Sequence, residues 1–285
     1  MGLHAAAGLR VELGGRVHAV ERPFGTIASS AGRVTDVAVD KGGNVHVLLR
    51  RDPLTEASGP AVLVFERDGR SLGAWGEEIA DAHMIACDAE GRMWVTDRDA
   101  HEVIAFTPQG ARVASLGTRH SPGQPFGHPS DIAFGPAGEV YVGDGYGHAL
   151  VHRFDSTLRP ELRWGGIGTG PGRFVTAHGI WVCGDGKVVV ADRENNRLQV
   201  FDRGGAFIRV IDGFHRPSDI WGDDEGRLFV TDGVPSLTCL SPDFERIGRC
   251  RPVLNGAHGL WGTADGLLYL AEGNPSRITR LVPLG

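Results

Sequence analysis

Three histidines stand at the same place in alternate copies of a unit that recurs along the sequence. They are His83, His178 and His258, in the second, fourth and sixth copies. The other copies carry a hydroxyl residue at this place: Thr35, Ser130 and Ser218. Three imidazoles that leave a fourth position open are a known ligand set of catalytic zinc sites. The alternation therefore predicts that the three histidines bind one divalent metal ion.

The recurring unit has the length and pattern of a propeller blade. It repeats about every 40 to 48 residues and contains two short apolar segments separated by a turn at an acidic residue and glycine, or a close variant. The turn glycines mark six copies: Gly43, Gly91, Gly138, Gly186, Gly226 and Gly266. We expect one all-β domain over residues 1–285, a six-bladed β-propeller of four-stranded blades that begin near residues 32, 80, 127, 175, 215 and 255.

Such a ring would place the histidines at its axis. Equivalent positions of a closed ring lie at equal distance from the axis, and the first strand of each blade is innermost. Histidines in every second blade then face one another across the central channel. The sixth copy ends at Leu281 after only three strands, and the alternating residues 9–22 are expected to supply the fourth and close the ring.

Composition and charge favour a small-molecule ligand. The 285 residues include 43 glycines and 16 prolines with a hydrophobic fraction of 41%, as expected for many short strands joined by turns. The net charge is −6 and no run of Lys and Arg occurs, so we expect no nucleic-acid or membrane partner. Residues 1–15 lack the apolar core of a signal peptide, which favours a cytoplasmic location and reduced thiols at the four cysteines. The sequence leaves the oligomeric state open.

The place that holds a histidine or a hydroxyl residue in each copy is called the column below. In five copies an acidic residue stands fourteen positions after the column: Asp97, Asp144, Asp192, Asp232 and Glu272. Because the first two strands of a blade form an antiparallel hairpin, these acids are expected beside the start of the first strand. An acid there either accepts the second ring N–H of a metal-binding histidine or binds backbone amides at the turn. Binding of backbone amides is the favoured role, because it also applies to Asp144 and Asp232, which belong to copies without a metal histidine.

Cationic residues and a tyrosine follow these acids at the expected mouth of the channel. Arg50, Arg51, Arg98 and Arg193 are candidates for substrate binding. A guanidinium matches a carboxylate in a bidentate pair, so we expect a small anionic molecule as the substrate. Arg98 and Arg193 each follow an aspartate and have ion pairing as their alternative role. Tyr146 lies at the same rim, either as a base whose pKa nearby cations lower or as an aromatic lid.

Five further histidines have other expected roles. His128 and His215 precede the column by two and three residues and are expected in the wall of the channel mouth or as caps. His101, His148 and His152 come in or after the turn between the second and third strands, where we expect a solvated surface.

Several segments of this chain resemble known families. The linker Trp164–Phe174 resembles the inter-blade segment of NHL repeats, which implies a six-bladed propeller of four-stranded blades. The segments that carry the three histidines, together with Asp144–Tyr146 and Val47–Arg50, resemble the peptidyl-α-hydroxyglycine α-amidating lyase family. The match at Ala191–Asn195, which reads Ala-Asp-Arg-Glu-Asn, is the most specific of these.

The lyase resemblance implies a reaction and the residues that perform it. It identifies the three histidines as zinc ligands, Tyr146 as the group that takes the substrate's hydroxyl proton, and Arg50 as the group that engages the carboxylate side. In that family a C–N bond breaks to give an amide and glyoxylate. The reaction is chemically reasonable, because a carbinolamide collapses once its hydroxyl loses a proton, and a metal ion makes this accessible near neutral pH.

The chain departs from the family pattern around the third histidine. Gly256 replaces a methionine, and Gly259 replaces an aspartate that helps to hold a structural calcium in that family. The expected cofactor is a divalent metal, with zinc favoured over iron and manganese, and calcium is doubtful. The substrate is either a peptidyl α-hydroxyglycine or a smaller N-acyl or ureido hydroxyglycine.

Two other functions stay open from the sequence. A metal-dependent hydrolase or lactonase that acts on a small carboxylate would use the same three histidines to activate water. Gluconolactonase-like propellers have the nearest fold, but they hold calcium with oxygen ligands that the histidines do not supply. A non-catalytic NHL interaction module would bind no metal and would expose apolar or basic patches instead.

Overall fold

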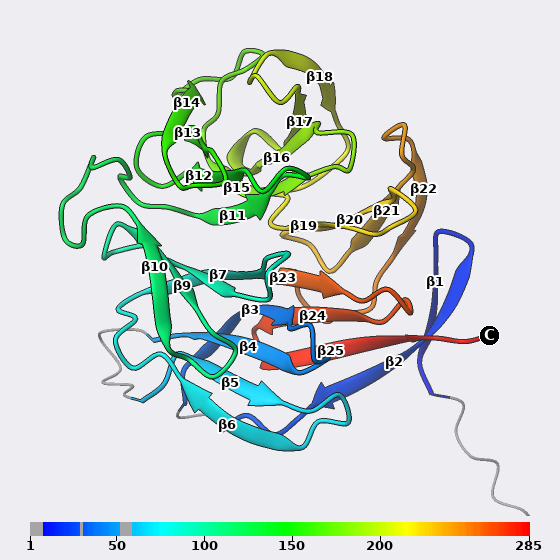
Figure 1. Cartoon of the computed structure of the whole chain (residues 1–285). Helices are drawn as coiled ribbons and strands as arrows, with labels where there is room; N and C mark the ends of the chain where they lie inside the picture. Colours follow the sequence, from blue (N-terminus) through cyan, green and yellow to red (C-terminus); the bar gives the residue numbers. More distant parts are fainter. Residues whose placement is uncertain (1–7, 29–30, 52–58) are drawn as a thin grey trace, which may run out of the picture.

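The computed structural model describes residues 8–28, 31–51 and 59–285. In these ranges the chain forms six antiparallel β-sheets around a central axis (Figure 1), which confirms the predicted six-bladed propeller. A short 3-10 turn, Arg193–Asn195, joins β16 (Val188–Asp192) to β17 (Arg197–Phe201). No helix within the described ranges is long and apolar enough to cross a membrane.

Five of the sheets are four-stranded blades, whose strands follow one another from the axis outward. Blade 1 is β3 (Arg33–Val39), β4 (Val45–Arg50), β5 (Val62–Phe65) and β6 (Ser71–Trp75). Blade 2 is β7 (Ala82–Cys87), β8 (Met93–Asp97), β9 (Glu102–Phe106) and β10 (Arg112–Leu116). Blade 3 is β11 (Asp131–Phe134), β12 (Val140–Asp144), β13 (Leu150–Phe154) and β14 (Pro160–Gly165). Blade 4 is β15 (Ala177–Val182), β16 (Val188–Asp192), β17 (Arg197–Phe201) and β18 (Phe207–Ile211). Blade 5 is β19 (Ile220–Gly222), β20 (Leu228–Thr231), β21 (Leu237–Leu240) and β22 (Arg246–Cys250).

The sixth blade closes the ring with strands from both ends of the chain. From the axis outward it contains β23 (Ala257–Gly262), β24 (Leu268–Gly273), β25 (Ser276–Pro283), β2 (Arg16–Phe24) and β1 (Arg10–Leu13). Figure 1 shows β2, in blue, beside β25, in red. The expected closure by an N-terminal strand is therefore confirmed. The sheet has five strands rather than four, because Gly14 and Gly15 adopt φ of +58° and +79° and turn the segment back on itself.

Each blade packs both of its faces against neighbouring blades. Alternate residues of β8 show this, since Met93 and Val95 belong to a cluster shared with blade 1, while Trp94 belongs to a cluster shared with blade 3. A strand buried on both faces reads as a nearly continuous apolar run, and all five residues of β8 are buried. Cys87 and Cys183 lie at the edges of such clusters as free thiols, and burial raises the pKa of each to about 12.

Candidate metal centre and active site

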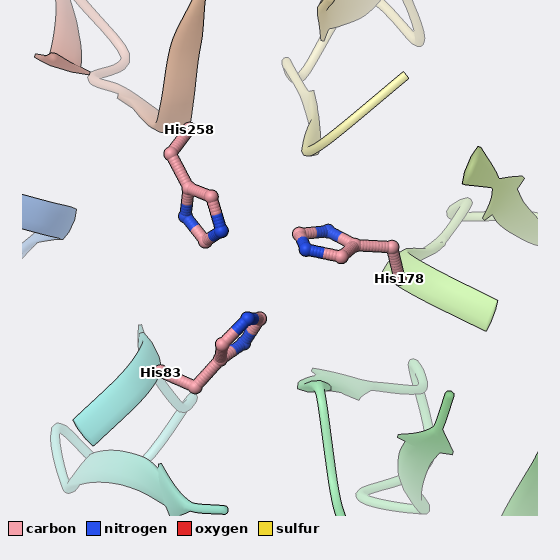
Figure 2. A group of neighbouring side chains, drawn as sticks. All are labelled: His83, His178 and His258. Atoms are coloured by element: carbon pink, nitrogen blue, oxygen red, sulfur yellow. The ribbon is translucent and has the colours of Figure 1, made fainter. Parts of the chain in front are cut away.

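The three alternate histidines meet at the propeller axis. His83 on β7, His178 on β15 and His258 on β23 point toward one another (Figure 2), and a ligand nitrogen of each lies within 4.8 Å of those of the other two. Their ring centroids are 4.9 to 5.0 Å apart, so the three rings form a nearly equilateral triangle. The structure thus brings together the three predicted metal ligands.

Each histidine lies in a β-bulge of its blade. The pairing between the first two strands shifts between Ala82 and Ile85 around His83 and between Ala177 and Ile180 around His178. The same shift occurs at Ala257 and Gly259 in blade 6. A bulge turns a side chain away from the regular alternation of a strand, and it is often found beside functional sites. The same shift surrounds Thr35 in blade 1, so the bulge also occurs at a position that carries a hydroxyl residue instead of histidine.

The backbone of the next blade fixes the orientation of each histidine ring. The Nδ1 atoms of His83 and His178 lie 2.6 and 2.7 Å from the carbonyl oxygens of Ser130 and Ser218. The Nδ1 of His258 lies 2.9 Å from the carbonyl oxygen of Thr35. An N–H at Nδ1 that donates to a carbonyl leaves the Nε2 lone pair free to bind a metal.

Two further observations fit a metal at this point. The Nε2 of His178 is buried and has no hydrogen-bond partner among the described residues, which is costly for a polar atom unless it binds something. Burial, together with the neighbouring His258 and His178, holds the pKa of His83 well below its usual value, and burial lowers the pKa of His258 to about 4. Neutral imidazoles are the form that binds metal.

Two of the three hydroxyl residues that alternate with the histidines, Thr35 and Ser130, join adjacent blades. The Ser218 hydroxyl instead donates to the carbonyl oxygen of Arg216, just before its own strand. The Thr35 hydroxyl donates to the carbonyl oxygen of His83, 3.0 Å away in blade 2. The Ser130 hydroxyl donates to the carbonyl oxygen of Ala177, 2.6 Å away in blade 4. The Thr35 and Ser130 hydroxyls thus support the innermost strands β7 and β15, a role not foreseen from the sequence.

Tyr146 lies beside the histidines with its hydroxyl toward the axis. Its hydroxyl oxygen is 3.2 Å from the Nε2 of His83, and it accepts a hydrogen bond of 3.1 Å from Nη1 of Arg193. The guanidinium of Arg98 lies over its ring, 5.2 Å from the centroid. Burial raises the pKa of Tyr146 above its ordinary value, although the charges of Arg193, Arg98 and Arg50 act in the opposite direction. The nearby arginines therefore do not by themselves lower this pKa as expected from the sequence. A Cβ at Gly145 would lie 2.1 Å from the carbonyl oxygen of Ala177, so only glycine allows this close approach.

Of the other predicted arginines, Arg50 and Arg98 bind the Asp81 carboxylate, whereas Arg51 binds backbone carbonyls. Arg50 lines the mouth of the channel, and its Nε donates to Asp81 at 2.6 Å. Arg98 binds the same carboxylate, with Nη2 2.7 Å from the Asp81 oxygen. Arg51 instead donates to the backbone carbonyls of Gly59 and Ile79 and does not line this channel mouth. Its predicted part in substrate binding finds no support in this placement.

The acids fourteen residues after the column bind backbone amides. Asp144 accepts from the N–H groups of Gly127 and His128 at 2.9 and 2.7 Å, and Asp192 accepts from Val175 at 3.0 Å. The other members do the same, namely Asp97, Asp232 and Glu272. The favoured role of these acids therefore matches their contacts, and backbone carbonyls hold the histidine rings instead.

Two of the histidines expected at the surface are buried. The side chain of His152 is 5% exposed and lies 3.5 Å from Asp144, whereas His148 is 44% exposed. His101 is also buried, and its Nδ1 is hydrogen-bonded to the carbonyl of Gly127. The expectation was wrong for these two because residues of the inter-blade linker lie against them: Gly127 binds His101, and the ring of Phe126 packs against His152 on β13.

A cavity of about 370 Å³ opens above the histidines. Its lining is mostly polar and includes Arg33, Arg50, Tyr146, Arg193, Arg216, Asn255, Asn274 and His258. Sequence reasoning missed Arg33 and Arg216. The sequence did contain an indication of them, because Arg33 and Arg216 each stand two residues before the column, as does His128.

Three aspartates line a second axial cavity, of about 170 Å³, which also contains residues that follow the histidines. Asp36, Asp131 and Asp219 stand one position after the hydroxyl column. Asp131 accepts from the backbone N–H of Ile180 at 2.8 Å, and Asp219 accepts from that of Leu260 at 2.7 Å. A Cβ at Gly259 would lie 1.9 Å from Oδ1 of Asp36, so the Asp36 carboxylate occupies the space that a side chain at position 259 would need.

The buried Asp131 is expected to make the stability of the protein depend on pH. Burial raises the pKa of Asp131 to about 7, against hydrogen bonds from Ile180 and Ile132 that lower it. The folded state therefore keeps a proton that the unfolded chain loses near pH 3.9, so this stabilisation is present at low pH and is lost as the pH rises toward 7. We expect the free energy of unfolding to fall by about 1.4 kcal/mol per pH unit for this group across that window.

Urea unfolding at pH 5 and 7 and a carboxyl carbon NMR titration would measure this effect. Asp40 serves as the internal control, because hydrogen bonds from His46 and Asn44 outweigh its burial and lower its pKa to about 2. A midpoint for Asp131 near the ordinary value of about 4 would contradict the prediction.

Comparison with known proteins supports the lyase resemblance. A model of the NHL repeat family matches residues 174–201. A Caenorhabditis elegans protein named probable peptidyl-alpha-hydroxyglycine alpha-amidating lyase pgal-1 is 27% identical over 96% of this chain and 81% of its own length. Mouse (Mus musculus) NHL repeat-containing protein 3 is 35% identical over 59% of this chain, and the match spans 51% of the mouse protein, about half its length.

A solved structure shows the same fold. The gluconolactonase XC5397 from Xanthomonas campestris superposes with a TM-score of 0.73 over 99% of this chain and 94% of its own. At 16% sequence identity, this likeness concerns the fold alone. The chain is therefore a six-bladed propeller with an NHL repeat, and it resembles the peptidyl-α-hydroxyglycine α-amidating lyases.

Proposed function

We propose that this protein is a metal-dependent lyase that cleaves the C–N bond of an α-hydroxyglycine-type carbinolamide to give an amide and glyoxylate. The observation that carries the proposal is the position of the Tyr146 hydroxyl. It lies 3.2 Å from Nε2 of His83, within a group of three histidines, and it accepts a hydrogen bond from Arg193. A proton acceptor, a metal ligand set and a carboxylate-binding cation thus converge at the floor of a polar cavity.

The three histidines suit a divalent metal, and we propose zinc. Their Nδ1 atoms are held by carbonyl oxygens, so the Nε2 atoms are the ligands. A metal ion at this point would polarise the substrate hydroxyl and lower its pKa. Nitrogen ligands suit zinc better than calcium. The Asp36 carboxylate also fills the space that a side chain at position 259 would need, so the aspartate that helps to hold calcium in the lyase family would not fit there.

The protein's own side chains would then move the proton and hold the substrate. Burial alone raises the pKa of Tyr146, so a metal ion bound beside it would be needed to favour the phenolate. As the phenolate, Tyr146 would take the proton of the hydroxyl, and Arg193 would stabilise the phenolate oxygen through its hydrogen bond. Arg193, beside Tyr146, would bind the substrate α-carboxylate, and Arg50 lines the same cavity from blade 1. When the C–N bond breaks, the electron pair goes to the amide nitrogen, and Tyr146 returns the proton there. The products are an amide and glyoxylate, with no further reactant needed.

The proposal is tested by metal analysis and by release of glyoxylate. Protein purified without chelator is expected to contain about one equivalent of transition metal, and a small N-acyl α-hydroxyglycine such as N-acetyl-α-hydroxyglycine is expected to yield glyoxylate. The assay is run with zinc, iron and cobalt supplied in turn. Less than about half an equivalent of metal would favour a non-catalytic NHL module. Bound metal without glyoxylate from any α-hydroxyglycine would reject the lyase reaction.

A further inference from the structure

Two arginines lie directly opposite each other at the mouth of the cavity. Arg33 at the start of β3 and Arg50 at the end of β4 are cross-strand partners. Like charges in this arrangement destabilise a sheet. Arg50 is neutralised by Asp81, but Arg33 is exposed and forms no ion pair with any carboxylate among the described residues. A destabilising, unbalanced charge in a binding cavity points to an anionic ligand.

Two of the arginines at the cavity mouth have no close carboxylate of their own. Asp81 and Asp99 lie within ion-pair distance of Arg98, and Asp81 also binds Arg50. Glu194 binds Arg216 at 2.8 Å and is 3.8 Å from Arg193, a longer contact that it must share. The cations without a close carboxylate of their own are therefore Arg33 and Arg193. The Nε of Arg193 is also buried without a hydrogen-bond partner in the described structure.

These two cations stand on opposite sides of the axis. Arg33 belongs to blade 1 and Arg193 follows β16 in blade 4, and these blades face each other in a six-membered ring. Both line the cavity above the histidines. A Cβ at Gly273 would lie 2.7 Å from Nε of Arg33, so the lack of a side chain there leaves room for the guanidinium. The arrangement suits a ligand with negative groups on both sides of the metal centre.

We propose that the substrate is a dianion, whose α-carboxylate is bound near Arg193 and whose amide side carries a second carboxylate that Arg33 recognises. This inference rests on the proposed lyase function. The composition of the wall agrees with it, since Val34 and Ala257 are the aliphatic side chains among the lining residues described. Together with the ring of Tyr146, they offer little of the broad apolar surface that a hydrophobic acyl group needs. Arg33 is then the residue that sets specificity for the amide side.

Binding of unreactive analogues tests the second charge independently of catalysis. N-succinylglycine and N-succinamoylglycine have the same shape and differ in one carboxylate, which is a primary amide in the second. Calorimetry on the metal-loaded protein is expected to show that the dianion binds about ten-fold or more tightly than its amide. In Arg33→Gln this ratio is expected to fall toward one, and in Arg33→Lys it is expected to be partly retained.

The matched control is Arg163→Gln, an exposed arginine on β14 in the outer strand of blade 3, which should keep the wild-type ratio. A ratio near one in the wild type, or an unchanged ratio in Arg33→Gln, would overturn the proposal. The corresponding α-hydroxyglycines are then assayed for glyoxylate. If neither reacts, the lyase function fails, while the binding ratio still decides whether Arg33 recognises a second carboxylate.

Discussion

Replacing His178 with alanine is expected to remove the bound metal and to lower glyoxylate production by at least about a thousand-fold. His178 is fully buried, and its Nε2 faces the axis without another partner in the described structure. With this ring gone, two histidines remain, and two ligands hold a divalent ion far more weakly than three. Loss of the metal removes several kcal/mol of charge stabilisation from the transition state.

Metal content by mass spectrometry and the rate of glyoxylate release measure the two effects together. The matched control is His120→Asn, because His120 is exposed and adopts a φ of 57°, which asparagine tolerates. The control should retain metal and activity. Circular dichroism shows whether His178→Ala is folded, and His178→Gln provides a second variant of similar volume. If folded His178→Ala keeps the wild-type amount of metal, the three-histidine centre is rejected.

The ring and the histidine triangle could be predicted because both depend on the repeat. Turn glycines such as Gly91 and Gly186 fix the alignment of the blades, and the alignment alone places His83, His178 and His258 at equal radius. A six-membered ring then requires that alternate positions converge on one axis. No contact had to be known in advance for this conclusion.

The finer contacts could not be predicted because they depend on how one blade meets the next. The carbonyl of Ser130 holds His83 from the neighbouring blade, and a repeat pattern does not contain the rotation between blades. The same is true of Asp36, whose carboxylate fills the space beside Gly259. Arg33 could have been found, because its position two residues before Thr35 matches that of Arg216 before Ser218.

The sequence indicated the bulges at the histidines only in part. Glycine directly follows His178 and His258, and at Gly179 a Cβ would lie 2.5 Å from the carbonyl oxygen of Ser218. Met84 follows His83 instead, so this pattern is not shared by all three blades. A sequence shows that a small residue is present, but not that the strand pairing shifts there.

The second large effect is expected for Tyr146→Phe. This variant should retain its metal and its substrate KM while kcat falls by about a hundred-fold to ten-thousand-fold, the range for removal of a general base. The change deletes one oxygen, which lies 3.2 Å from Nε2 of His83 and accepts a hydrogen bond from Arg193. The ring that lies under Arg98 remains, so a purely steric lid would be preserved.

Because Tyr146→Phe removes the hydroxyl and keeps the ring, this variant distinguishes the two metal-dependent reactions, lyase and hydrolase. A hydrolase would use a metal-activated water as its nucleophile and would not need the phenol, so Tyr146→Phe would retain turnover while His178→Ala would lose it. The lyase needs both, because the substrate hydroxyl must give up its proton. Tyr269→Phe is the matched control, since Tyr269 is buried in a cluster between blades 6 and 1, away from the cavity above the histidines. Full activity in metal-loaded Tyr146→Phe would therefore reject the proposed base and favour hydrolysis at the same centre.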